Sequence, residues 1–110
     1  MKLSALIEKT GYEVVSAGKD DAEIKAGYTG DLLSDVMANA PSDSVLVTIQ
    51  AHKNTIAVAT LAGIRVIVLC NGRSIPDDMK EAAAAESIAL LSTREDQFTV
   101  SARISKLISI

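Results

Sequence analysis

Two largely apolar runs constrain the fold of this chain more than any other feature. Residues 45–49 and 66–70 form these runs, and the stretch 54–61 between them has helical spacing and is followed by Gly63. Apolar residues at consecutive positions are typical of strands that are covered on both faces. Two such strands joined by a helix form a βαβ unit. The chain is therefore predicted to contain a parallel sheet.

The same alternation continues to the C-terminus. Pro76 is expected to open a helix with carboxylates in its first turn, and residues 88–91 are expected to form a third short strand. Proline suits the first turn of a helix, and acidic side chains suit its positive end. The final helix is predicted to open with a capping box at residues 93–96. Its apolar stripe consists of Val100, Ile104, Leu107 and Ile108.

The N-terminal third adds smaller elements to this βαβαβα core. Apolar spacing and turn residues indicate two helices and two short strands. They are a helix that ends at Gly11, strands near 12–16 and 24–28, and a helix bearing Leu32, Leu33, Val36 and Met37 that stops before Pro41. We expect a single α/β domain over residues 1–110, with a small, mainly parallel sheet in two or three layers.

Charge and cysteine content indicate which partners and which cellular compartment to expect. The net charge of −3 leaves no basic surface of the kind that nucleic acids require, so no nucleic-acid partner is expected. No apolar run approaches the length of a membrane span, and the N-terminal apolar stretch is too short for a secretory signal. The single cysteine, Cys70, forms no internal disulfide and favours a reducing compartment. The protein is expected in the cytoplasm, without a membrane partner.

Three segments together resemble the DRTGG domain family. They are Tyr-Thr-Gly-Asp-Leu-Leu-Ser-Asp at 28–35, Val-Leu-Cys-Asn-Gly at 68–72 with Pro76 beyond, and Thr93 followed by Asp-Gln-Phe-Thr-Val-Ser-Ala-Arg-Ile at 96–104. The resemblance covers roughly Ile24 to the C-terminus. It implies a fold similar to the N-terminal domain of HPr kinase/phosphorylase. Members of this family occur alone, beside CBS domains as regulatory segments, and within long phosphate acetyltransferases.

The predicted site lies where the parallel strands end, because ligands of open α/β sheets bind outside those ends. Helix N-termini direct backbone N–H groups there, so an anionic or strongly polar ligand is expected. The candidate ligand-binding residues are Gly30, Asp31, Gln50, His52, Asn54, Asn71, Gly72, Arg73 and Thr93. Replacing His52 or Asn71 with alanine is expected to abolish binding at little cost in stability.

A structural interpretation of the same polar residues stays open. Asn, Ser and Thr often cap helices or satisfy loop backbone groups, and a lone histidine is more often a cap or a surface residue than a catalytic base. No metal site is expected, because His52 has no second ligand at a suitable spacing. Cys70 at a strand end is expected to pack as a small apolar residue.

Missing catalytic motifs favour a role without catalysis. The chain contains no G-x-x-x-x-G-K-[ST], G-x-S-x-G, H-E-x-x-H or C-x-x-C, so neither kinase activity nor a cofactor is expected. The leading hypothesis is a regulatory or ligand-binding module that senses a small polar or anionic metabolite or nucleotide, or docks on a partner protein.

Two other functions remain alternatives. One is an interaction scaffold that acts as a homodimer, which the mean hydropathy of +0.26 favours. Its predicted face is the helix with Leu33, Val36 and Met37. The other is a minimal enzyme that uses His52 together with Gln50 and Asn54.

Overall fold

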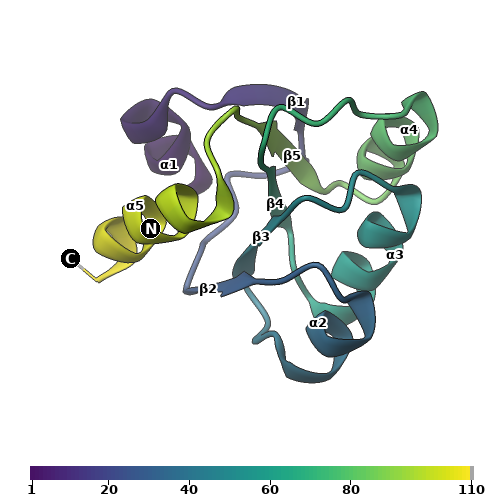
Figure 1. Cartoon of the computed structure of the whole chain (residues 1–110), viewed down its shortest axis with the longest axis horizontal. Coiled ribbons are helices and arrows are strands. Elements are labelled where there is room, and N and C mark those ends of the chain that lie inside the picture. The colour runs from purple at the N-terminus through teal and green to yellow at the C-terminus, as the bar shows by residue number, and fades with distance from the viewer. Residues whose placement is uncertain (110) are drawn as a thin grey trace.

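A five-stranded sheet forms the centre of the computed structural model, which describes residues 1–109 (Figure 1). The strands are β1 (Glu13–Ala17), β2 (Ala26–Thr29), β3 (Ser44–Thr48), β4 (Val66–Leu69) and β5 (Ala89–Ser92). Their spatial order is β1-β5-β4-β3-β2, in which β2 to β5 are parallel and β1 is antiparallel to β5. The predicted parallel core is confirmed, and the N-terminal segment adds a strand at each edge.

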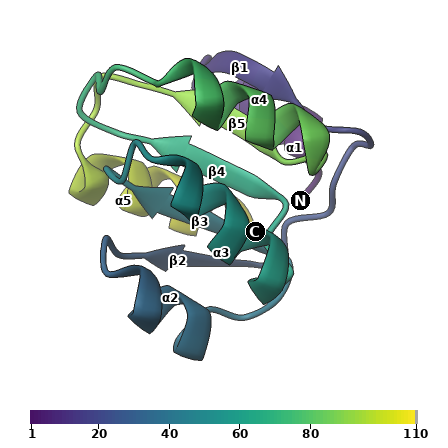
Figure 2. The same ribbon diagram turned by 90° about the vertical axis from the view of Figure 1, so that its right-hand side faces the viewer.

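The helices cover both faces of the sheet and make three layers, which decides between the two arrangements expected (Figure 2). One face carries α1 (Leu3–Thr10) and α5 (Gln97–Ile108). The other carries α2 (Leu33–Asn39), α3 (Lys53–Ala62) and α4 (Asp77–Ala85), which lie side by side. Over the described residues 1–109, no helix is long and apolar enough to cross a membrane.

Each central strand contributes to two hydrophobic cores. Val66 and Val68 of β4 pack in the cluster beneath α1 and α5, whereas Ile67 and Leu69 pack in the cluster beneath α2, α3 and α4. Side chains of a strand alternate between the faces of a sheet, so a strand covered on both faces favours apolar residues at every position. This preference explains the apolar runs in the sequence, in which Thr48 is the one polar member.

The last helix begins later than its predicted capping box. Asp96 is the N-cap of α5, and its Oδ1 accepts a hydrogen bond of 2.8 Å from the backbone N–H of Thr99. The predicted cap at Thr93 is wrong. The Thr93 hydroxyl instead accepts from the N–H of Glu95 at 3.1 Å, within the loop that precedes the helix. The backbone N–H groups of Asn71 and Gly72 donate to the carbonyl oxygens of Glu95 and Thr93, so this loop is held by its neighbour and the helix starts after it.

The α2 helix does not present the apolar face that the sequence suggests. Val36 is completely buried under the sheet, and Leu33 is only partly exposed, whereas Leu32 and Met37 are exposed. Because Val36 faces the sheet and Met37 is the next residue, these side chains point in different directions. The set Leu33, Val36 and Met37 is therefore wrong as a single interaction surface.

Candidate functional site

All nine predicted site residues lie in loops or a helix start at one edge of the sheet. The parallel strands β2 to β5 end there, and each is followed by residues of the predicted set. Gly30 and Asp31 follow β2, residues 50–54 follow β3, residues 71–73 follow β4, and Thr93 follows β5. The topology thus gathers the loops as expected, and the side-chain contacts distinguish the residues within them.

Asp31 lies at the centre of the polar contacts. Its Oδ1 accepts hydrogen bonds from the Thr48 hydroxyl at 2.9 Å, the Ile49 N–H at 2.9 Å and Gln97 Nε2 at 3.0 Å. Gln50 Nε2 donates to the carbonyl oxygen of Asp31 at 2.9 Å. The carboxylate of Asp31 already accepts the hydrogen bond from the N–H of Ile49, directly after β3. An anionic ligand at this position would have to displace the carboxylate.

Gln97 is a member of this cluster that the predicted site did not include. It is the first residue of α5 and brings that helix to the loop after β2. The segment that carries the family resemblance contains it, so a signal was present. Its partner could not be identified from the sequence, because 66 residues separate it from Asp31.

Asn71, Gly72 and Thr93 join the two neighbouring loops. Asn71 and Gly72 have φ values of 66° and 60°, in the left-handed region. Their backbone N–H groups donate to the carbonyl oxygens of Glu95 and Thr93, both at 2.9 Å. These N–H groups are consumed within the protein, whereas the exposed side chain of Asn71 faces solvent.

His52 is the N-cap of α3. Its Nδ1 accepts a 3.0 Å hydrogen bond from the N–H of Asn54, so the structural interpretation is confirmed for this residue. The contact requires a neutral imidazole with its proton on Nε2, which can donate outward. Thr55 strengthens the same turn, because its hydroxyl donates to the carbonyl of Gln50 at 2.8 Å.

Two predicted residues lie away from Asp31. Arg73 lines a separate hollow of about 390 Å³ beside β1, together with Glu13 and Lys80. Asn54 lines a hollow between α3 and α4. The turn at residues 71–72 sends the chain towards β1, which explains the position of Arg73. The expected preference for an anionic ligand relied partly on the positive charge of Arg73, and this charge lies outside the group of residues around Asp31.

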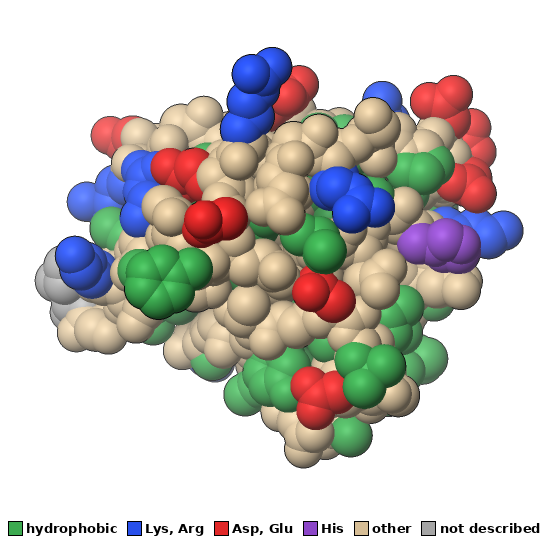
Figure 3. All heavy atoms as spheres, viewed as in Figure 1, with side chains coloured by type: hydrophobic (Ala, Val, Ile, Leu, Met, Phe, Trp, Pro, Cys, Tyr) green, Lys and Arg blue, Asp and Glu red, His purple; other side chains and the backbone are tan. Residues whose placement is uncertain are grey.

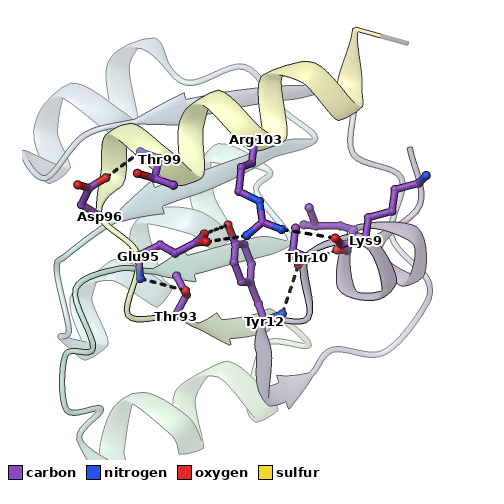
Figure 4. A network of polar contacts seen from close by, with 9 residues as sticks. Lys9, Thr10, Tyr12, Thr93, Glu95, Asp96, Thr99 and Arg103 are labelled. Atoms are coloured by element: carbon purple, nitrogen blue, oxygen red, sulfur yellow. Dashed lines mark hydrogen bonds and ion pairs between the residues drawn. The ribbon is translucent and has the colours of Figure 1, made fainter.

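A network of Tyr12, Glu95 and Arg103 fixes the β5–α5 loop from the other side (Figure 4). The Tyr12 hydroxyl donates to Glu95 Oε1 at 2.6 Å, and Arg103 forms an ion pair with Glu95 Oε2 at 2.6 Å. The Arg103 guanidinium lies 5.4 Å from the centre of the Tyr12 ring. Burial and the hydrogen bond to Glu95 raise the pKa of Tyr12. The network holds α1, the loop and α5 together.

Cys70 is buried at the end of β4. Burial, and then the negative charges of Asp31, Asp96 and Glu95, raise the pKa of Cys70 to about 11. The thiol is thus protonated at neutral pH and is a poor nucleophile. These properties agree with its expected packing role.

Acidic and basic side chains are interspersed on the face of the molecule that Figure 3 shows.

Comparison with protein families identifies the fold. A sequence model of the DRTGG domain matches residues 5–107, nearly the whole length. The chain belongs to the DRTGG domain family. The resemblance noted in the sequence is thereby confirmed. No curated protein gives a significant match to this DRTGG domain.

A solved structure shares the fold of this DRTGG domain. It contains the CBS and DRTGG domains of the regulatory region of Clostridium perfringens pyrophosphatase, complexed with the activator diadenosine tetraphosphate. The TM-score is 0.70 at 11% sequence identity, over 91% of this chain and 44% of the other. The DRTGG domain therefore spans less than half of that chain. At this identity the likeness concerns the fold alone.

Proposed function

We propose that this DRTGG domain is a regulatory module that binds a small polar metabolite or nucleotide at the carboxyl edge of its parallel strands. The Asp31 cluster carries the proposal, because it joins the ends of β2 and β3 to the start of α5. A ligand that contacts Asp31 or its partners would change the hydrogen bonds of all three elements. Such coupling suits a module that reports ligand binding to its surroundings.

The acceptors around Asp31 favour a ligand with hydrogen-bond donors. Asp31 Oδ1 already serves three donors, whereas Oδ2 forms no hydrogen bond within residues 1–109. Gln50 and Gln97 use their amide NH₂ groups towards Asp31, which leaves their amide oxygens as acceptors. Amino groups of a base or hydroxyls of a sugar match this set. The phosphates of a nucleotide would lie away from Asp31.

The relative in the pyrophosphatase supports a regulatory role, since that regulatory region is complexed with a nucleotide activator. We do not propose the minimal enzyme. Nδ1 of His52, which would act as a base, accepts a hydrogen bond from the N–H of Asn54, and burial raises the pKa of the Cys70 thiol so that it is a poor nucleophile.

The test is a thermal-shift screen with adenine nucleotides, diadenosine tetraphosphate and common metabolites. A ligand at 100 times its Kd should stabilise the fold by about 2.7 kcal/mol. Product analysis of each ligand after incubation checks for turnover, and none is expected. A screen in which no compound raises Tm, or a ligand that is converted, would contradict the proposal.

Two variants that keep the local backbone locate the site. His52→Ser retains a capping oxygen but removes the ring, and Asn71→Gly retains the left-handed backbone but removes the amide side chain. Both should weaken binding about ten-fold or more while retaining most of the stability, as expected for a lost ligand contact. Arg73→Ala, at the separate hollow beside β1, is the matched control. Unchanged affinity in both variants would move the site elsewhere.

A further inference from the structure

The α3 helix is unusually apolar for a helix at the surface. Residues 54–64 contain no charged side chain. On its inner side Ile56 and Ala59 are buried, and on its outer side Ala57 and Leu61 are exposed, with Leu61 75% exposed. A surface helix of a globular protein normally carries charged residues on its outer face. The outer face of α3 therefore has the composition of a covered surface.

A hollow of about 450 Å³ accompanies this face, between α3 and α4. Ile56, Ala57, Leu61 and Ala82 contribute its apolar lining. Figure 2 shows the two helices side by side at the outside of the molecule. Alanines permit close approach of another helix, and the exposed Leu61 can fill a hollow of the same kind.

The two ends of the hollow carry opposite charges. Lys53 is the first residue of α3, and Glu86 follows the last residue of α4. Both helices follow parallel strands and run in the same direction, so these residues lie at opposite ends. Within residues 1–109 neither Lys53 nor Glu86 forms an ion pair. A surface of this kind is complementary to itself after a two-fold rotation.

We propose that the hollow between α3 and α4 is the surface through which two copies of this chain associate. The copies pack with their α3 helices antiparallel, and Leu61 of each enters the hollow of the other. Lys53 then faces Glu86 of the partner subunit, and this contact occurs twice. The surface takes the place of the α2 face, which the burial of Val36 removes. The proposal is independent of the ligand site.

The first test is the mass of the full chain by light scattering and sedimentation equilibrium. We expect twice the chain mass of 11.5 kDa for the unmodified protein. Leu61→Lys should give a monomer with an unchanged circular dichroism spectrum, because this side chain is exposed within one copy, and its Tm should no longer depend on protein concentration. Phe98→Lys, at an 84% exposed position on α5, is the matched control and should remain dimeric.

The second test exchanges the charges. Lys53→Glu or Glu86→Lys alone places like charges together and should raise the dimer dissociation constant about ten-fold, whereas the double variant should recover most of the loss. Lys106→Glu on α5 controls for net charge. A protein that stays monomeric at its solubility limit, a dimeric Leu61→Lys variant, or a double variant weaker than both single variants would each overturn the proposal.

Discussion

Gln97 donates from Nε2 to Oδ1 of Asp31 over 3.0 Å, although 66 residues separate the two along the chain. The bond connects the first turn of α5 to the loop after β2. The same oxygen also accepts hydrogen bonds from the Ile49 N–H and the Thr48 hydroxyl. A single carboxylate oxygen therefore connects the end of β3 to the start of α5. Because three donors depend on this acceptor, the site and the stability of the fold are linked here.

Asp31→Ala should lower the free energy of unfolding by about 2–3 kcal/mol, because it leaves several partly buried donors without their acceptor. Gln97→Ala should cost less, since only one donor is lost. Asp31→Asn retains a carbonyl oxygen and should fall between them. Urea unfolding followed by circular dichroism measures all three. An Asp31→Ala midpoint equal to that of the unmodified protein would show that the contacts contribute nothing.

His52→Ala should lower the free energy of unfolding by about 1 kcal/mol through loss of the α3 cap. This expectation replaces the one drawn from the sequence, in which alanine at this position cost little. His52→Asn and His52→Ser offer side-chain oxygens to the same N–H and should retain most of the stability. Thermal unfolding of the three variants at neutral pH decides the matter; equal losses in all of them would exclude capping.

Asn71→Ala should also destabilise the fold, by about 1 kcal/mol, because residues with a Cβ are disfavoured in the left-handed region and Asn tolerates it better than Ala. Here, too, the sequence-based expectation of a small cost is revised. Asn71→Gly removes the side chain without that strain and should match the unmodified protein. Urea midpoints give the comparison. If the glycine variant were the less stable, the side chain itself would be stabilising the turn.

Stability should fall as the pH rises above about 9. The pKa of Cys70 is raised from 9.0 to about 11 in the folded chain, so its thiol ionises first in the unfolded state. Stability is fully present below pH 9 and is lost progressively as the pH rises towards 11. The raised pKa of Tyr12 acts in the same direction at higher pH.

Cys70→Ala tests this assignment. Its stability should decline less between pH 9 and 11 than that of the unmodified protein, even if its absolute stability is lower. Urea midpoints measured across this pH range, under reducing conditions, provide the slopes. Parallel slopes for the two proteins would assign the decline to other groups.

The sheet was predictable because burial on both faces favours apolar residues at consecutive positions of a strand, and this pattern can be seen in the sequence. The apolar runs of β3 and β4 have no polar alternation, and the glycine after α3 marks its end. Loop geometry leaves a weaker trace. Thr93 has the composition of a cap, yet hydrogen bonds to the neighbouring loop override that preference and shift the cap to Asp96.

The candidate site was predictable only at the level of loops. Strand order places Asp31 and Gln50 at the same edge, and they do contact each other. Arg73 lies in one of the right loops, but the left-handed turn before it determines its direction, and that turn points towards β1. Gln97 was missed because its role depends on how α5 crosses the sheet, which no local pattern specifies.

The central position of β4 has a consequence for hydrogen exchange. This strand has a neighbouring strand on each side and a helical layer on each face, so solvent reaches its amides only when the whole domain opens. Edge strands β1 and β2 can open locally. Deuterium uptake at the amides of β4 should therefore report the free energy of global unfolding, and any ligand that binds the folded domain should slow it.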